Sequence, residues 1–511
     1  MTVGIQIQPD IEADPPGPFP PPGDGAVDDP PIRRRGGSIY FAATFFAQAC
    51  ALLRYIVMAR LLGPEQLGLA ATLVLTGSFF DLISDTGSDR FLIQDRHGGT
   101  TQVQNLTQLV GMSRGVITAA CLVTFSVPIA YFYHQPRLAG GFAVLAIAPF
   151  TLGFLNLDIR RQQRTHDFRS QAISMLAAEL SGLVATITAA WVVRDFTAIL
   201  YGLITRAVVL VLVSHLRSER PFRPAWSREH APRLARFAAP LMLNGFMLFI
   251  VSQGDRVIVG NQLGAKALGF YSSVFLLIYY PTALLAEYIH AMYIPMIAAQ
   301  RDSRLGRNSV CDDLGAKTFL LGILMAVGFA IAAPTLVPIL FGRRFGQSSL
   351  LVGLIGILQV ARFLISWPTT TALAIGRSDT VLVSNLAQLI AFAGAFIGLW
   401  LIGGLGGVVV GFILGELIAI AVALILLNRN MDRGPLHGFD RLLAFTCVCG
   451  AIVGWNLALG SGGWPAQACM LILSVALGVW LWRRESAVIV ELVSLARRYA
   501  RLLFSSHRKD I

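Results

Sequence analysis

Long apolar stretches dominate this sequence and constrain its fold more than any other feature. They recur from Ser38 to the region of Trp480 with short polar breaks between them, and a helix needs about 20 such residues to cross the roughly 30 Å hydrocarbon core of a bilayer. The chain is 55% hydrophobic and only 14% charged, whereas soluble domains usually carry about 25% charged residues. Alternating segments of about ten residues, typical of membrane barrels, do not dominate. The sequence therefore predicts an all-α, polytopic membrane bundle.

The apolar pattern predicts about fourteen transmembrane helices. The positive charges agree with that count, because Lys and Arg accumulate in short cytoplasmic loops. With the N-terminus inside, the cytoplasmic segments hold 30 basic residues and the opposite side holds six, namely Arg60, Arg137, Arg194, Lys266, Arg343 and Arg344. Both termini are therefore expected in the cytoplasm. The predicted spans are residues 38–60, 67–89, 108–133, 138–157, 170–193, 196–215, 237–260, 268–298, 318–341, 348–375, 380–402, 407–427, 442–460 and 464–482.

The two ends of the chain differ from its apolar middle. Residues 1–31 hold nine prolines and six carboxylates without Lys or Arg, a composition that predicts disorder. They do not resemble a signal peptide, because Arg33, Arg34 and Arg35 directly precede an apolar segment of full spanning length, so the first helix is expected to be retained. From Glu485 onward, apolar residues at helical spacing lie beside arginines, which predicts a helix on the anionic inner leaflet or a solvated helical tail.

An internal repeat divides the apolar region into two halves. The stretch IVMARLLGPEQLGLAA, which ends at Ala71, is echoed by VIVGNQLGAKALGFYS, which ends at Ser272. Each copy follows an odd-numbered span, so the two halves are expected to run in the same direction with a central cavity between them. The repeated residues are Leu62, Gly63, Leu67 and Gly68, which recur at Leu263, Gly264, Leu268 and Gly269 with an offset of 201. The predicted organisation is a disordered acidic tail (1–32), an N-terminal six-helix half (33–216), a basic cytoplasmic linker (217–236), a C-terminal six-helix half (237–428), two additional helices (429–484) and a basic amphipathic tail (485–511).

Composition and motifs argue against several function classes. The formal charge of +12 lies in loops that flank the membrane, so topology explains it better than nucleic-acid binding. The six scattered cysteines have no metal-ligand spacing, and we expect neither a metal nor a cofactor. The chain lacks the G-x-x-x-x-G-K-[ST] motif for ATP and is expected to use an ion gradient, a substrate gradient or a partner. Short outer connections argue against a glycan polymerase or ligase, and an ion channel has no positive signal.

Four segments resemble the polysaccharide-transporter branch of the multidrug/oligosaccharidyl-lipid/polysaccharide exporter superfamily, which includes Wzx-type flippases. ARLLGPEQLGL at residues 59–69 resembles the first-hairpin signature, and DRVIVGNQLGAKALGFYS at 255–272 is the most specific match. The other two are FFDLISDTGSDRFLIQ at 79–94, where Asp85 matches the usual acidic position, and YIP at 293–295. The resemblance covers about residues 33–430. The proline-rich tail and Ser88-Asp89 depart from the pattern and leave the substrate's identity open.

The resemblance implies a fold, an activity and partners. Family members move undecaprenyl-diphosphate-linked sugar repeats from the cytoplasmic to the periplasmic leaflet, for exopolysaccharide, O-antigen or capsule. It therefore implies a multi-pass flippase of the bacterial inner membrane, not an enzyme, with two pseudo-symmetric halves like those of multidrug exporters. The implied partners are the lipid-linked oligosaccharide, membrane lipids and the polysaccharide polymerase machinery, with no nucleic acid. A cation-coupled multidrug exporter of the same superfamily is the alternative.

Charged residues within the predicted spans are the candidate functional residues. Arginine in hydrocarbon costs about 2.5–3.5 kcal/mol on insertion scales and should face protein or a wet cavity, and guanidinium groups pair bidentately with phosphate oxygens. Snorkelling or a structural ion pair is the alternative for each arginine. The candidate substrate-binding residues are Arg54, Arg206, Arg362, Arg114 and Arg256, the last also a candidate for a structural role.

Carboxylates within the spans are expected to neutralise some of these arginines or to bind a coupling proton or cation. The candidate ion-coupling residues are Glu179, Glu287, Glu416 and Asp85. Asp81, Asp85 and Asp89 are four residues apart and are predicted to share one helix face in a solvated vestibule. His290, one turn from Glu287, is a weaker candidate for a proton relay than for a structural hydrogen bond.

Overall fold

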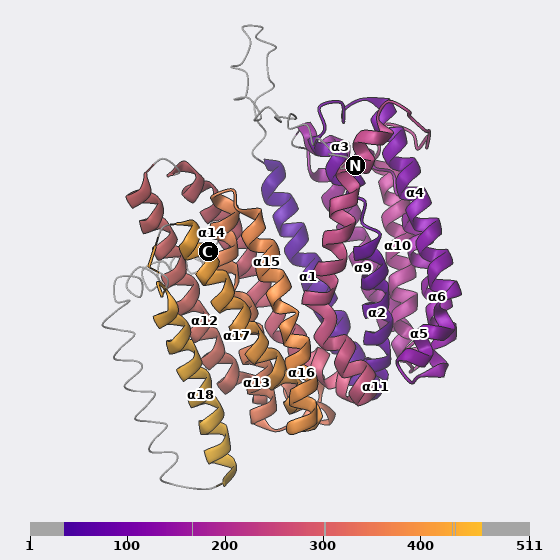
Figure 1. Ribbon diagram of the computed structural model, residues 1–511. Helices are drawn as coiled ribbons and strands as arrows, with labels where there is room; N and C mark the ends of the chain where they lie inside the picture. The colour runs from indigo at the N-terminus through magenta and orange to yellow at the C-terminus, as the bar shows by residue number, and fades with distance from the viewer. Residues whose placement is uncertain (1–34, 166, 301–302, 432, 435, 462–511) are drawn as a thin grey trace, which may run out of the picture.

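The computed structural model describes residues 35–165, 167–300, 303–431, 433–434 and 436–461. Helices form the described chain, with no strand among these residues, and Figure 1 shows them as two bundles with α1 (Arg35–Leu62) between them. The predicted disordered tail, the last predicted span and the predicted amphipathic tail lie outside the described residues. The all-α membrane fold is confirmed, because eleven of the described helices are long and apolar enough to cross a bilayer.

The first bundle, here called the N-half, runs from α1 to α10. Pro64 follows Gly63 at the start of α2, where proline's missing N–H costs nothing, and the Thr100 hydroxyl accepts a hydrogen bond from Val103 N at the start of α4, a favoured helix cap. Its helices are α1 (Arg35–Leu62), α2 (Pro64–Ile83), α3 (Ser88–Gln94), α4 (Thr101–Thr124), α5 (Ser126–Phe132), α6 (Ala139–Leu145), α7 (Ile147–Leu152), α8 (Asp158–Arg161), α9 (Arg169–Val192) and α10 (Ala198–Arg217).

Helices α11 to α18, drawn from pink to yellow in Figure 1, are here called the C-half, and the first part of α11 lies beside α2 of the N-half. The Ser303 and Ser348 hydroxyls cap α12 and α13 by accepting from backbone N–H groups three residues on. Its helices are α11 (Ala231–Ala299), α12 (Arg304–Phe341), α13 (Ser349–Leu364), α14 (Ser366–Ala374), α15 (Ser378–Gln388), α16 (Ile390–Leu401), α17 (Gly404–Asn430) and α18 (Phe439–Ser461).

The number of spans differs from the predicted fourteen in an explicable way. Helix α11 is 69 residues long, but Gly264 within it has the non-helical angles φ 79° and ψ 179°, so two spans meet there. The fourth predicted span corresponds to residues Pro136–Leu152, which form shorter apolar helices. Because the last predicted span lies outside the described residues, the count of fourteen is not confirmed.

The repeated glycines have matching geometry and lie against each other. Gly63 has φ 81° and ψ 175°, close to the values at Gly264, and such positive φ angles favour glycine. A Cβ on Gly68 would collide with the Ala265 carbonyl, and a Cβ on Gly269 would collide with the Pro64 carbonyl. The two copies of the repeat therefore form a close contact between the halves at one end of the bundle.

Other cross-half contacts lie at this same end. Arg60 donates to the carbonyls of Ile339 and Leu340, the latter at 2.8 Å, and Asn261 donates to the Phe132 carbonyl at 2.5 Å. The two halves are thus closed against each other here. We call this the closed end, and the other, which carries α3, α8 and residues 218–230, the basic end.

The contact between the repeats predicts a stability effect. We expect Gly269→Ala to destabilise the protein by roughly 1–3 kcal/mol, because the new methyl group forces the backbones of the halves apart. Gly328→Ala on α12 is the matched control, since a Cβ there meets nothing within 4 Å, and alanine favours helix. Thermal unfolding in detergent measures both variants. Equal melting temperatures for the two would contradict the close packing.

The end of α2 corrects one sequence prediction. The second span was placed at 67–89 with three aspartates on one helix face, but α2 ends at Ile83 and Asp89 lies on α3. The reason is local: Gly87 adopts the left-handed conformation, and Asp85 accepts a hydrogen bond from Gly87 N at 3.0 Å, a turn that competes with helix. Only Asp81 belongs to α2.

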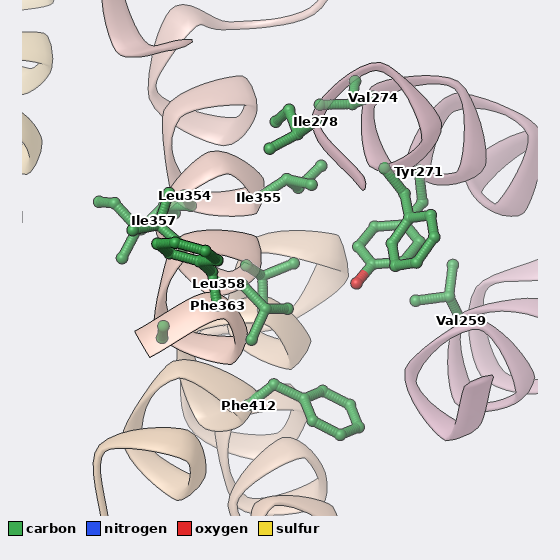
Figure 2. Packing of buried hydrophobic residues seen from close by; sticks show 14 of the residues in the cluster. Val259, Tyr271, Val274, Ile278, Leu354, Ile355, Ile357, Leu358, Phe363 and Phe412 are labelled. Carbon is green, nitrogen blue, oxygen red and sulfur yellow. The ribbon is translucent and has the colours of Figure 1, made fainter. Parts of the chain in front are cut away.

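Apolar packing holds the C-half together. Tyr271, Val274 and Ile278 on α11 point toward Ile355 and Leu358 on α13 in Figure 2. All five are fully buried or nearly so. This packing fixes the second part of α11 against the helices that carry the charged residues described below.

A buried carboxylate organises the basic end. Asp158 is fully buried, and it accepts hydrogen bonds from Arg161 Nε at 2.6 Å, Gln162 Nε2 at 3.2 Å and Glu219 N at 2.7 Å. Burial alone would raise the pKa of Asp158, but the hydrogen bonds from Arg161 and Glu219 N outweigh it and hold the pKa below its ordinary value. Asp158 therefore ties α8 to the start of the linker between the halves.

We expect Asp158→Asn to lower stability at neutral pH by about 1–3 kcal/mol, because the donors of Arg161, Gln162 and the Glu219 backbone lose a charged acceptor. A depressed pKa stabilises the fold above the carboxyl's ordinary range and loses that contribution as the pH falls through it. The difference in melting temperature between the unaltered protein and Asp158→Asn should thus be largest near pH 7 and shrink toward about pH 3. A difference that stays constant with pH would contradict this account.

Candidate functional site

A polar cavity lies inside the N-half near the basic end. Its volume is about 390 Å³, and residues of α2, α3, α4, α7, α8 and α10 line it, which puts it within the size range of small-molecule sites. A second cavity of about 110 Å³ adjoins it and shares Asp81, Thr118 and Arg206 with it. Both lie within the N-half. The central cavity that the sequence analysis expected between the halves stays a prediction. The charged residues that line the larger cavity are Asp81, Asp85, Asp89, Arg90, Arg114, Arg160 and Arg206.

Helix packing explains this location. The first part of α11 lies along α2: the Phe79 and Phe249 rings contact each other at 5.0 Å, and a Cβ on Gly245 would collide with the Leu82 carbonyl. This first part of α11 therefore packs along α2, whose residues Asp81 and Leu82 line the cavity.

Two arginines converge on one carboxylate beside the cavity. Glu179 on α9 is buried and accepts from Arg54 Nη2 on α1 at 3.4 Å and from Arg206 Nε on α10. The arginine side chains are 12% and 35% exposed, and Arg206 also lines the cavity. One carboxylate balances only one guanidinium, so this group, the N-half cluster, carries an excess positive charge. Arg54 Nη1 is buried without a hydrogen-bond partner among the described residues.

Arg114 and Asp85 lie at the mouth of the same cavity. Arg114 on α4 donates to the Ser84 hydroxyl at 2.9 Å and to the Asp81 carbonyl at 2.8 Å, so it satisfies carbonyl and hydroxyl groups at the end of α2. Its guanidinium is 3.8 Å from Asp81 and 4.0 Å from Asp85. Asp85 also approaches Arg90 at 3.5 Å. These partly exposed pairs make the mouth polar and nearly balanced in charge.

The C-half holds the reverse arrangement, with one arginine between two carboxylates. Arg362 on α13 donates to Asp255 on α11 at 2.9 Å and to Glu416 on α17 at 3.0 Å. The Tyr271 hydroxyl donates to Asp255 at 2.5 Å, and Gln388 donates to Glu416 at 3.2 Å. Both carboxylates are buried. This group, the C-half cluster, fully compensates its arginine and joins four helices.

Arg256 lies next to the C-half cluster but points elsewhere. Its guanidinium carbon lies 4.2 Å from the centre of the Phe275 ring, a cation–π contact, and its side chain donates to Gln253. Its backbone N–H donates to the Asp255 carboxylate. Arg256 thus has a defined packing partner, which favours the structural role that the sequence analysis kept open.

The described structure shows no hydrogen bond or ion pair between Glu287 and His290. Glu287 is exposed on α11, while His290 Nδ1 lies 3.0 Å from the Thr370 hydroxyl on α14. The structural role of His290, favoured from sequence, agrees with this hydrogen bond. A coupling role for Glu287 remains a prediction.

The sequence analysis found the charged members of both clusters but missed their neutral members. Glu179, Asp255 and Glu416 do neutralise arginines, as expected. Tyr271 and Gln388 were missed, because tyrosine and glutamine within apolar spans give no charge signal. Tyr271 lies inside the 255–272 segment that resembles the family signature, which is the one signal that could have singled it out.

The sequence also matches a known family. Residues 57–350, more than half of the chain, match the family described as "Polysaccharide biosynthesis protein". The chain belongs to this family. The predicted resemblance to polysaccharide transporters is therefore confirmed.

Three bacterial proteins are similar in sequence over about half or more of the chain. The lipopolysaccharide biosynthesis protein WzxC of Escherichia coli K12 is 22% identical over 74% of this chain and 77% of that protein. The amylovoran biosynthesis protein AmsL of Erwinia amylovora is 24% identical over 52% of this chain and 70% of that protein. The succinoglycan biosynthesis transport protein ExoT of Rhizobium meliloti is 22% identical, over 59% of this chain and 61% of that protein.

Solved structures show that this family member shares the fold of known transporters. The lipid II flippase MurJ in an inward closed conformation has a TM-score of 0.64 at 13% identity, with 89% of this chain and 99% of that chain covered. An inward-facing multidrug transporter of the MATE family has a TM-score of 0.61 at 15% identity, with 81% and 99% covered. At such low identity these likenesses describe the fold alone.

Proposed function

We propose that this protein is a flippase for a lipid-linked oligosaccharide, an undecaprenyl-diphosphate repeat unit used to build exopolysaccharide, O-antigen or capsule. It is a multi-pass protein of the bacterial inner membrane, and we place both termini in the cytoplasm, so that the basic end faces the cytoplasm. It carries out transport and no chemical reaction on the lipid. Contact with the polysaccharide polymerase machinery is part of the proposal. The names of the related transport proteins and the family membership support it.

The observation that carries this proposal is the excess positive charge of the N-half cluster. Arg54 and Arg206 share the single carboxylate of Glu179, and Arg206 faces a cavity near the basic end. An isolated ionised group in hydrocarbon costs tens of kcal/mol, whereas charge-assisted hydrogen bonds from guanidinium to phosphate repay part of that cost. A diphosphate that entered the cavity would take the place of Glu179 between the two arginines.

The rest of the cycle follows from the two ends of the bundle. The halves touch at the closed end through Gly68, Gly269 and Arg60, while the cavity lies near the basic end. In the proposed cycle, the head group binds from the cytoplasm, the lipid tail stays in the bilayer, and the contacts at the closed end separate to release the head group on the other side. The C-half cluster stays intact and moves as part of a rigid half.

A cation-coupled multidrug exporter is the second candidate, because the fold of the inward-facing MATE transporter is shared. The carboxylates at the cavity mouth, Asp81, Asp85 and Asp89, are the observation that favours it, since a cationic drug would seek them. Four arginines line the same cavity, so its charge does not select for cations. An anionic substrate therefore fits better.

The test is transport by the purified full chain in proteoliposomes. One sample contains fluorescent undecaprenyl-diphosphate oligosaccharide in the bilayer, and a parallel sample contains a cationic dye with a proton or sodium gradient. We expect the labelled sugar to change leaflets while the dye stays in place. Dye export without movement of the lipid-linked sugar would replace the flippase with the multidrug exporter.

A further inference from the structure

A column of aromatic rings runs along α11 beside the two charged clusters. Tyr271, Phe275 and Tyr279 are four residues apart, so their rings lie above one another on the helix. The Tyr271 and Phe275 ring centres are 6.2 Å apart, and the Phe275 and Tyr279 rings are stacked at 5.2 Å with 15° between their planes. The column is thus a continuous feature and not three separate core residues.

The first two rings of the column are held in place. Tyr271 is fully buried and donates its hydroxyl to Asp255, which is itself paired with Arg362. Phe275 is buried beneath the guanidinium of Arg256 at 4.2 Å. Stacking on Phe275 therefore fixes the plane of the third ring, Tyr279, at little further entropy cost.

The third ring leaves the core and meets a second tyrosine. Tyr279 is 43% exposed, and its ring contacts that of Tyr280 edge to face, with the centres 5.9 Å apart. Tyr280 lies close enough to Arg54 and Arg256 to interact with both electrostatically. Tyr280 of the tyrosine pair, Tyr279 and Tyr280, thus lies within electrostatic range of Arg54, the arginine of the N-half cluster with an unpaired buried nitrogen, and the helices of the two residues, α11 and α1, are in contact.

We propose that the tyrosine pair is the binding platform for the sugar ring next to the diphosphate. The C–H groups on the apolar face of a pyranose carry partial positive charge, which suits the negative face of an aromatic ring, while the phenol hydroxyls can bond sugar hydroxyls. This assignment rests on the proposed function. The protein then recognises the first sugar through α11 of the C-half and the diphosphate through the arginines of the N-half. A complete substrate therefore bridges the two halves.

The experiment compares two lipids with each protein in proteoliposomes: undecaprenyl diphosphate bearing the oligosaccharide, and undecaprenyl diphosphate without sugar. The variants are Tyr279→Leu and Tyr280→Leu, which keep apolar bulk but lose the ring, and Tyr279→Phe and Tyr280→Phe, which keep the ring. Tyr201→Ala on α10, where the side chain is 54% exposed, is the control. Gel filtration and melting temperature verify folding of each variant.

We expect the leucine variants to raise the half-saturating concentration of the glycosylated lipid about two- to tenfold, with the sugar-free lipid unaffected. The phenylalanine variants should retain most of the affinity, and Tyr201→Ala should match the unaltered protein. If the leucine variants transport the glycosylated lipid with unchanged half-saturation, or if transport of both lipids is weakened equally, the platform is overturned and the proposed flippase function stands. Failure of the unaltered protein to move the glycosylated lipid would overturn the proposed function itself.

Discussion

Replacing Arg206 with alanine is expected to weaken binding of undecaprenyl-diphosphate oligosaccharide by about tenfold to a hundredfold, because a hydrogen bond to a charged group contributes about 1.5–3 kcal/mol. Arg54→Ala should act similarly. Affinity can be measured on the full chain in detergent by thermophoresis or tryptophan fluorescence. Arg137→Ala is the matched control, since Arg137 is an exposed arginine paired with Glu65 near the closed end.

Glu179→Gln distinguishes a carboxylate that competes with the diphosphate from one that is purely structural. The amide keeps the shape of Glu179 but no longer competes with the diphosphate for Arg54 and Arg206, so affinity for the lipid should rise while stability without ligand falls. If Glu179 only braces the helices, affinity and stability should both fall. An Arg206→Ala protein that binds the lipid as tightly as the Arg137→Ala control would contradict the anion site.

Removal of Arg362 is expected to have the largest effect on stability. Arg362→Met leaves Asp255 and Glu416 buried beside each other without a cation, and breaking a buried pair in this way costs about 3–5 kcal/mol. The variant should show a much lower yield of folded protein and a lower melting temperature in detergent. Transport should fall only in proportion to the folded fraction, because the C-half cluster does not line the described cavities.

A compensated variant separates lost charge from lost packing. Arg362→Met combined with Asp255→Asn and Glu416→Gln leaves no buried charge among these three residues and should recover most of the stability, since neutral groups are much cheaper to bury than charged ones. If the triple variant is as unstable as Arg362→Met alone, shape and not charge governs this cluster. If Arg362→Met alone is as stable as the unaltered protein, the ion pairs contribute nothing.

The sequence was sufficient for the fold class and for the charged members of both clusters. Spanning segments are long and uniform in composition, so hydropathy identifies them, and arginines such as Arg54 and Arg362 are conspicuous in apolar surroundings. The glycine repeat was also informative. Gly264 requires glycine for its positive φ, and Gly269 requires it for a close backbone contact. Each of these features depends on a local property of the chain.

What the sequence did not predict depends on tertiary packing. The cavity inside the N-half forms where residues of α2, α4, α7 and α10 come together, and no local pattern encodes that arrangement. The early end of α2 depends on the left-handed Gly87 and on Asp85, whose side chain accepts a hydrogen bond from the Gly87 backbone. The span predicted from sequence ran on to residue 89. The pairing of arginines with carboxylates 27 to 125 positions away likewise follows only from the folded bundle.

The most direct measurement is a cryo-electron microscopy structure of the full chain in nanodiscs with undecaprenyl-diphosphate oligosaccharide bound. The central claim is that the excess positive charge of the N-half cluster holds the diphosphate. It predicts phosphate density within hydrogen-bonding distance of Arg54 and Arg206, with Glu179 displaced from between them. Phosphate density at Arg362, or at neither cluster while Glu179 keeps both of its arginines, would contradict the claim.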